Sequence, residues 1–306
     1  MKFVSATALS HRLGRAAGEP THCWTAKSKE FLVSHTTRER RLNLCFRVKM
    51  AQTEAEKESN IVLALDFPFE KPENRRQLFS KAEHLLAAVH PYLCAAKFNH
   101  HLVLPLGTFD GVQKLVEKAH DMGLMAIMDC KINDIGATNQ VIAEYYYAAG
   151  FDALIANPLI GWEEGLKPVF DVAARLRRGT ILLVFMSHKA SAEGYGMTTV
   201  DAKTGRQVPQ YVRFARQALK HGADGAVVGA TYPGKIKEVY DILAKKVPIY
   251  SPGVGAQGGK AQEAVMAGAS YLIVGREITL AENPAKVAER IRDDARYAKR
   301  ETRGRF

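Results

Sequence analysis

The chain has 306 residues, 47% of them hydrophobic and 25% charged, which is the composition of an ordinary globular protein with a large core. No apolar run approaches the roughly 18 residues that a membrane span needs. The formal net charge of +11 is concentrated in residues 1–49, whose ten Lys or Arg and three Glu give +7. The body of the chain is therefore only weakly basic, and it contains no recognisable nucleic-acid-binding module.

The four cysteines, Cys23, Cys45, Cys94 and Cys130, lack the paired spacing of a metal site. Cys94 and Cys130 fall in predicted interior strands, where a free thiol behaves as a small hydrophobe. Unpaired cysteines are typical of a reducing compartment, so we expect a cytoplasmic protein.

Residues 1–58 are predicted to form a basic, disordered N-terminal extension, followed by one folded domain at residues 59–306. The extension is rich in Arg and poor in acids, as transit peptides are, but it lacks the apolar segment of a secretory signal. Met50 opens a segment of different composition, which would be a natural start for a cytosolic protein. A disordered or mis-assigned leader is the favoured interpretation, and organelle targeting is the alternative.

From residue 61 onward, short apolar segments alternate with longer amphipathic ones. The predicted strands are Ile61–Asp66, Cys94–Asn99, Gly123–Ile132, Ala153–Pro158, Thr180–Ser187, Gly225–Ala230, Pro248–Val254 and Tyr271–Ile278. The predicted helices are Glu73–His90, Phe109–Met122, Asn139–Ala149, Glu163–Arg178, Val208–His221, Lys235–Lys246, Lys260–Ala267 and Ala285–Arg300. Apolar strands separated by helices indicate a parallel sheet covered on both faces. Their number predicts an α/β fold, a single (β/α)8 TIM barrel, with a doubly wound open sheet as the alternative.

The most informative motif is Asp129-Cys-Lys-Ile-Asn-Asp134, in which an apolar strand ends in charge. Because side chains alternate along a strand, Asp129 and Lys131 should point to the same face and Cys130 to the other. Buried charges are costly unless they are paired, so this strand end marks a candidate active site. A purely structural ion pair is the alternative interpretation.

Other polar residues lie at predicted strand ends, which a barrel brings together on one face. Asp66, Lys97 and Ser187 lie at the ends of the first, second and fifth strands. The glycine-rich segment 251–259 and the pair Gly275-Arg276 follow the seventh and eighth strands, where barrels often bind phosphate. Backbone N–H groups of such a loop can approach an anion closely. The alternative is that the glycines only make tight turns.

Taken together, these residues resemble the orotidine 5′-phosphate decarboxylase family over roughly residues 60–290. The motif Asp129-x-Lys131-x-x-Asp134-Ile135-x-x-Thr138 carries the resemblance most strongly. It is supported by Ala64-Leu-Asp66, Lys97, Met186-Ser-His188, Ser251-Pro-Gly-Val-Gly-Ala-Gln257 and Val274-Gly-Arg276. The resemblance implies decarboxylation of orotidine 5′-phosphate to UMP and CO2, the last step of de novo UMP biosynthesis, with no metal and no cofactor.

The resemblance also implies a role for each matching residue. Lys131 would donate a proton to C6 of the pyrimidine, with Asp129 beside the substrate carboxylate and Lys97 linking that carboxylate to the ribose. Asp134, Ile135 and Thr138 would come from the partner subunit of a homodimer and complete the neighbouring site. The substrate-binding residues would be Pro252, Asp66 at a ribose hydroxyl, Ser187 at the pyrimidine amide edge, and Gln257, Gly275 and Arg276 at the 5′-phosphate.

Two rival functions share parts of this pattern. A Mg²⁺-dependent sugar-phosphate decarboxylase or hexulose-phosphate synthase has the same Asp-x-Lys-x-x-Asp core and uses the metal to stabilise an enediolate. A non-catalytic nucleotide-binding barrel would keep only the phosphate site. The chain departs from the family pattern at Asn99-His100-His101, where a smaller or more apolar turn is expected. Adjacent histidines on a strand would point opposite ways, which argues against a metal site there.

Overall fold

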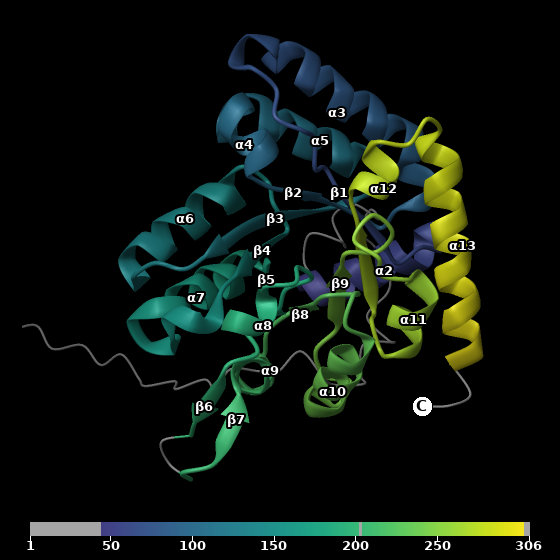
Figure 1. Ribbon diagram of the computed structural model, residues 1–306. Coiled ribbons are helices and arrows are strands. Elements are labelled where there is room, and N and C mark those ends of the chain that lie inside the picture. Colours follow the sequence, from purple (N-terminus) through teal and green to yellow (C-terminus); the bar gives the residue numbers. More distant parts are fainter. Residues whose placement is uncertain (1–43, 202–203, 303–306) are drawn as a thin grey trace, which may run out of the picture. The chain divides into compact units, whose positions relative to one another are not determined.

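A computed structural model describes residues 44–201 and 204–302. Within these residues, eight parallel strands close into a barrel in the order β1-β10-β9-β8-β5-β4-β3-β2 (Figure 1). The strands are β1 Ile61–Ala64, β2 Ala95–Phe98, β3 Met125–Ile132, β4 Ala153–Ala156, β5 Gly179–Phe185, β8 Gly225–Val228, β9 Ile249–Pro252 and β10 Tyr271–Val274. The predicted (β/α)8 barrel is confirmed, and the open-sheet alternative is wrong.

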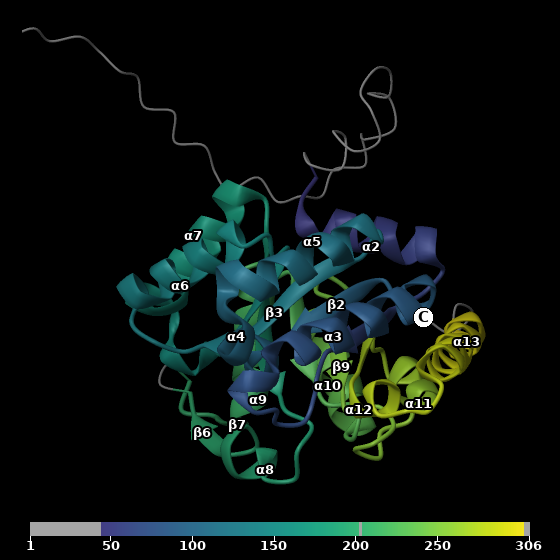
Figure 2. The ribbon, with the colours of Figure 1, turned by 90° about the horizontal axis from the view of Figure 1, so that it is seen from above.

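Helices connect the strands and surround the barrel, as the view in Figure 2 shows. They are α2 Phe46–Lys57, α3 Arg75–Val89, α4 His100–Leu106, α5 Gln113–Asp121, α6 Gly136–Ala148, α7 Lys167–Leu176, α8 Ser191–Gly194, α9 Gln210–Lys220, α10 Pro233–Leu243, α11 Ala261–Met266, α12 Arg276–Thr279 and α13 Pro284–Thr302. Short 3₁₀ or π-helical turns lie at Pro72–Asn74, His90–Tyr92, Gly107–Val112, Pro158–Ile160 and Trp162–Leu166. None of the helices in this described part of the chain could cross a bilayer.

All eight predicted helices are present, with ends displaced by a few residues. The sequence did not predict α4, α8 or α12, which are too short to show a helical period. The connection after β5 contains a small antiparallel hairpin of β6 Thr198–Val200 and β7 Gln207–Pro209. The predicted strand Tyr271–Ile278 is too long, because β10 ends at Val274 and the chain turns at Gly275 into α12.

Helix α2 corrects the predicted domain boundary at residue 59. Its side chains Phe46 and Met50 are each only 1% exposed and belong to the apolar cluster inside the barrel. Arg47 pairs with Asp224 at 3.5 Å and donates to the Lys246 carbonyl, which attaches the helix to the barrel strands' amino ends. A chain that started at Met50 would lack Phe46 and Arg47. The prediction of disorder for residues 1–58 is wrong for residues 46–57, which form this helix. The rest of that prediction, and the targeting alternative, concern residues 1–43, which lie outside the described residues.

Phe46 fills the interior of the barrel beside Gly179 at the start of β5. A Cβ atom on Gly179 would overlap the Phe46 ring, so the glycine is required by this close approach. Tyr250 and Tyr271, which stack with ring centroids 4.7 Å apart, belong to the same interior cluster. The amino-terminal end of the barrel is therefore packed with apolar and aromatic rings, and function is expected at the other end.

Phe46→Ala should destabilise the protein by about 3–5 kcal/mol, because it removes a buried ring and leaves a cavity. The free energy of unfolding from a denaturant titration measures this effect. Phe69→Ala is the matched control: Phe69 is 88% exposed, and its loss should change stability by less than about 0.5 kcal/mol. Equal stability of the two variants would contradict the packing role of α2.

Candidate active site

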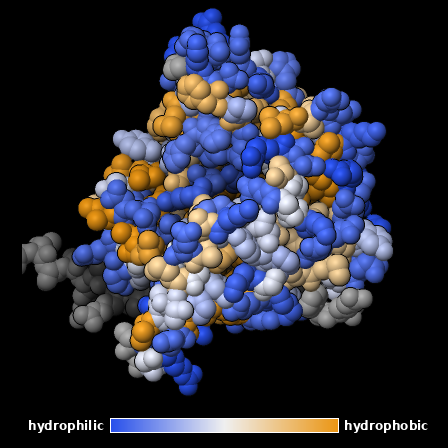
Figure 3. Space-filling model, viewed as in Figure 1, coloured by the Kyte–Doolittle hydropathy of each residue, from blue (hydrophilic) through white to orange (hydrophobic). Residues whose placement is uncertain are grey.

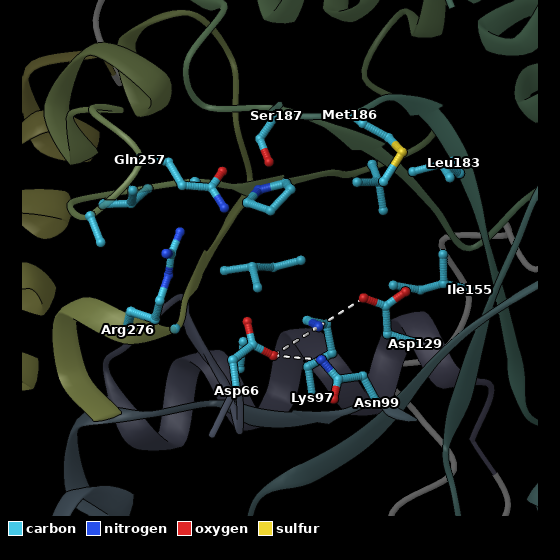
Figure 4. A pocket seen from close by; sticks show the side chains of 18 of the residues that line it. Asp66, Lys97, Asn99, Asp129, Ile155, Leu183, Met186, Ser187, Gln257 and Arg276 are labelled. Carbon is cyan, nitrogen blue, oxygen red and sulfur yellow. Dashed lines mark hydrogen bonds and ion pairs between the residues drawn. The ribbon is translucent and has the colours of Figure 1, made fainter. Parts of the chain in front are cut away.

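A pocket opens at the carboxyl ends of the barrel strands (Figure 4). It brings together nine of the twelve predicted site residues: Asp66, Lys97, Asp129, Lys131, Ser187, Pro252, Gln257, Gly275 and Arg276. These residues lie on or directly after β1, β2, β3, β5, β9 and β10. They are far apart in the sequence and meet because parallel strands in a closed barrel end on the same face.

A row of alternating charges lies along one wall of the pocket. The Asp129 carboxylate accepts a hydrogen bond from Lys131 Nζ at 2.7 Å on Oδ1 and from Lys97 Nζ at 2.8 Å on Oδ2. Lys97 Nζ also lies 4.0 Å from Asp66 Oδ1. The prediction that Asp129 and Lys131 share a face is confirmed. Each buried charge has a partner of opposite sign, which is what makes their burial tolerable.

This pairing decides the charge states of the two most buried groups. Burial raises the pKa of Asp129, but Lys97 and Lys131 more than offset it and lower the pKa to about 2. Burial lowers the pKa of Lys97, whereas Asp129 and Asp66 raise it, and the net direction is upward. Both groups are therefore ionised at neutral pH, although Lys97 is only 5% exposed.

The backbone at Lys131 departs from regular strand geometry. The pairing of β3 with β4 shifts register between Met128 and Ile132, which marks a bulge. Lys131 itself has φ +49°, a left-handed conformation that costs a lysine about 1–2 kcal/mol. Bulges next to active sites re-aim side chains, and strain of this kind persists where the surrounding structure enforces it. We infer that the bulge directs the Lys131 ammonium toward the pocket.

The end of the pocket opposite Asp129 is suited to a phosphate. Figure 4 shows the Arg276 guanidinium and the Gln257 amide together at this end. The loop glycines contribute less than the sequence suggested, because the Gly258 and Gly259 N–H groups donate to loop carbonyls at 2.7 and 3.0 Å. The tight-turn interpretation is therefore correct for these two residues. A Cβ on Gly275 would lie 2.9 Å from Asp66 Oδ2, so this glycine leaves room for the Asp66 carboxylate beside it.

The pocket also contains residues that were not among the twelve predicted site residues. Ile155, Leu183 and Met186 line the wall beyond Asp129 in Figure 4 and offer an apolar surface to a planar ring. Asn99 lines the pocket as well and contacts Asp66. The sequence could have indicated Asn99, because side chains two positions apart on a strand point to the same face and Asn99 stands two residues after Lys97.

Three predicted site residues, Asp134, Ile135 and Thr138, do not reach this pocket. Asp134 accepts a hydrogen bond from the Ile135 N–H, and Ile135 is 64% exposed. Asp134 instead lines a second cleft, on the outside of the barrel, that Lys131 also borders. Within the described residues, no group of three or more His, Cys, Asp or Glu side chains is placed to hold a metal ion.

A family model described as Orotidine 5′-phosphate decarboxylase / HUMPS family matches residues 59–291. The chain belongs to this family. A relative from Methanosarcina acetivorans, named orotidine 5′-phosphate decarboxylase, is 33% identical over 239 residues, covering 78% of this chain and 96% of the relative. A relative of the same name from Pyrococcus abyssi is 33% identical over 236 residues, covering 77% and 99%.

Solved structures of the family agree with the fold described here. Orotidine 5′-monophosphate decarboxylase from Methanocaldococcus jannaschii, in complex with the inhibitor BMP, superposes with a TM-score of 0.64 at 29% identity, covering 78% of this chain and 98% of that one. The enzyme from Pyrococcus horikoshii superposes with a TM-score of 0.61 at 32% identity, covering 77% and 99%. The family match begins at residue 59, so α2 lies outside it.

The charge row predicts how Asp129 titrates. Its ionised form stabilises the fold above the unfolded pKa of about 3.9, and this contribution is lost as pH falls through about 2. In Lys97→Met the pKa of Asp129 should rise, because burial remains while one of two neighbouring cations is gone. The carboxyl carbon shift of Asp129 against pH, followed by NMR, measures this change.

Lys167→Met is the matched control for this titration. Lys167 pairs with Asp171 at 2.7 Å on the exposed face of α7, so its loss should leave the pKa of Asp129 unchanged. An Asp129 midpoint that is the same in wild type and in Lys97→Met would contradict the arrangement described.

Proposed function

We propose that this protein decarboxylates orotidine 5′-phosphate to UMP and CO2, the last step of de novo UMP biosynthesis, without a metal or organic cofactor. One observation carries the proposal: the paired charges of Lys131, Asp129 and Lys97 lie at one end of the pocket and Arg276 at the other. A nucleotide whose ring bears a carboxylate is anionic at both ends, and this pocket presents a cation to each. The names of relatives that align over most of this chain support the same activity.

The reaction needs a positive charge beside the reacting carbon. When the bond to the carboxylate breaks, its electron pair stays on C6 as a carbanion that the ring delocalises poorly. The Lys131 ammonium would stabilise this charge as it develops and then transfer a proton to C6, after which solvent restores the lysine. Asp129, hydrogen-bonded to Lys131 at 2.7 Å, holds the ammonium in place before the reaction starts.

The remaining pocket residues would bind the rest of the nucleotide. Lys97, between Asp129 and Asp66, links the reacting end of the site to the sugar, and Asp66 would accept a hydrogen bond from a ribose hydroxyl. Ser187 would meet the amide edge of the pyrimidine, with Pro252 and the apolar wall against its ring. Gln257, Gly275 and Arg276 would bind the 5′-phosphate. Binding energy from the phosphate, far from C6, can then be used to organise the reacting end.

The Mg²⁺-dependent rival in this superfamily would need carboxylate oxygens to coordinate the cation. In this pocket both oxygens of Asp129 already accept hydrogen bonds from lysines, so the geometry favours the decarboxylation of orotidine 5′-phosphate. Activity in the presence of a chelator separates the two functions directly.

Purified wild-type protein should consume orotidine 5′-phosphate in the presence of EDTA. The fall in the ultraviolet absorbance of the substrate measures this consumption. Lys131→Ala should lower kcat at least about 1000-fold, because it removes both the stabilising charge and the proton donor. Lys167→Ala, on the surface, should match wild type. Loss of wild-type activity in EDTA would favour the metal-dependent rival, and UMP binding without turnover would favour a binding-only barrel.

We also propose that the active enzyme is a homodimer with shared sites. Phe109, Ile135, Val141 and Tyr145 expose half or more of their surface around α6, and Figure 3 shows hydrophobic side chains on the edge where Figure 1 places this helix. Asp134 and Lys131 line the same outer cleft. A two-fold contact across that cleft is reciprocal, so Asp134 of the partner subunit would meet Lys131. Ile135 and Thr138 would accompany it.

Shared sites make a complementation test possible. Lys131→Ala and Asp134→Ala should each be nearly inactive alone, yet an equal mixture that exchanges subunits should regain about one quarter of wild-type activity, since half the dimers then hold one intact site. Activity per subunit after mixing measures this. An active monomer in sedimentation analysis, or no recovery in a mixture shown to exchange, would contradict the dimer.

The cysteines support a cytosolic location for this enzyme. Cys94 and Cys130 form no disulfide in the structure, and Cys94 is completely buried. Burial raises the pKa of Cys130 to about 12, which makes it a poor nucleophile. Both thiols thus serve the packing of the barrel, as expected in a reducing compartment.

A further inference from the structure

Asn99 connects the two loops that surround the sugar end of the pocket. It follows β2 directly, and its Nδ2 donates to Asp66 Oδ1 at 2.6 Å. Its Oδ1 accepts a hydrogen bond from the His101 N–H at 2.9 Å, at the start of α4. Because one end of the amide must donate and the other must accept, this side chain has a single orientation in the network.

A second contact ties the same loops together on the other side of Asp66. His101 Nδ1 lies 2.6 Å from the Phe67 carbonyl oxygen, to which it donates. Thr279 in α12 donates from its hydroxyl to the Asp66 carbonyl at 3.3 Å. The backbone of the Asp66 loop is therefore held by neighbours from two different strand connections, while its carboxylate is oriented by Asn99.

The two oxygens of Asp66 have different surroundings. Oδ1 accepts from Asn99 and lies 4.0 Å from the Lys97 ammonium, too far for a direct hydrogen bond. Oδ2 faces Gly275, beside Arg276 at the phosphate end of the pocket. Without the Asn99 amide, the carboxylate would be drawn toward Lys97, since an ion pair is the strongest partner available to it. Such a rotation would move Oδ2 away from a bound nucleotide.

We propose that Asn99 is a positioning residue that orients the Asp66 carboxylate to recognise a sugar hydroxyl of the nucleotide. The proposal rests on the function proposed above, and it assigns to the unexpected Asn99-His100-His101 segment a part in substrate recognition. Asn99 acts through Asp66. A purely structural account is that Asn99 only caps the first turn of α4, as asparagine often does.

Affinity for UMP and its deoxy analogues separates these accounts. Asn99→Ala should raise the Kd for UMP about 10- to 100-fold, the range expected for a hydrogen bond to a charged group. One of the two analogues, 2′-deoxy-UMP or 3′-deoxy-UMP, lacks the hydroxyl that Asp66 binds. For that analogue, Asn99→Ala should change the Kd by less than about threefold. Isothermal calorimetry on the full-length protein measures all of these values.

Asn99→Ser distinguishes positioning from capping. The serine hydroxyl can still accept from the His101 N–H, so the melting temperature should return to near the wild-type value. Serine has one polar side-chain atom where asparagine has two, so no group replaces the Nδ2 that donates to Asp66 when the serine oxygen caps the helix, and the weakened UMP binding should remain. Asn157→Ala is the matched control, because Asn157 accepts from the Leu159 N–H after β4 and does not line the pocket. Its Kd for UMP should stay within about twofold of wild type.

Two results would overturn the proposal. One is recovery of UMP affinity in Asn99→Ser, and the other is an increase in Kd on Asn99→Ala that is equally large for UMP and for both deoxy analogues. Neither depends on turnover. Failure of the wild-type protein to consume orotidine 5′-phosphate would refute the proposed function instead, so the two failures can be told apart.

Discussion

The hydrogen bonds from two lysines to the single Asp129 carboxylate are the interaction on which the site depends. A lone ammonium or carboxylate at this depth would change its protonation state to escape the cost of burial. The pairing lowers the pKa of Asp129 to about 2 and raises that of Lys97, so both charges persist. Only because they persist can Lys131 be held, already charged, at the place where a carbanion would form.

The apolar packing that stabilises the barrel and the charged side chains of the proposed active site lie at opposite ends of the barrel. Its amino-terminal end is filled by Phe46, Met50 and stacked tyrosines, and it tolerates little change, as the contact between Phe46 and Gly179 shows. Its carboxyl-terminal end bears the charge row, a bulge and a left-handed lysine. The apolar end compensates for the strain and desolvation at the charged end, a division typical of barrel enzymes.

One chain contains most, but not all, of the predicted site. Asp134 borders the outer cleft beside Lys131, where a reciprocal contact would bring an additional acid to each lysine. A carboxylate from a second chain would allow the site to be completed only on assembly. It would also explain why apolar side chains such as Ile135 and Val141 remain exposed in the isolated chain.

Periodicity and apolar runs are local properties, so they were enough to predict the eight barrel strands and eight of the helices, but not α2, α4, α8 or α12. Strand alternation also predicted that Asp129 and Lys131 would share a face, whereas the bulge and the left-handed backbone that place Lys131 were not predictable from it. Tertiary structure alone decided that Phe46 belongs to the core, that the Gly258 and Gly259 amides are used within their loop, and that Asn99 orients Asp66. The contacts of Phe46 and Asn99 are made with segments that are distant in the sequence, and the hydrogen bonds of Gly258 and Gly259 depend on how their turn folds. The local spacing of residues predicts neither kind of contact.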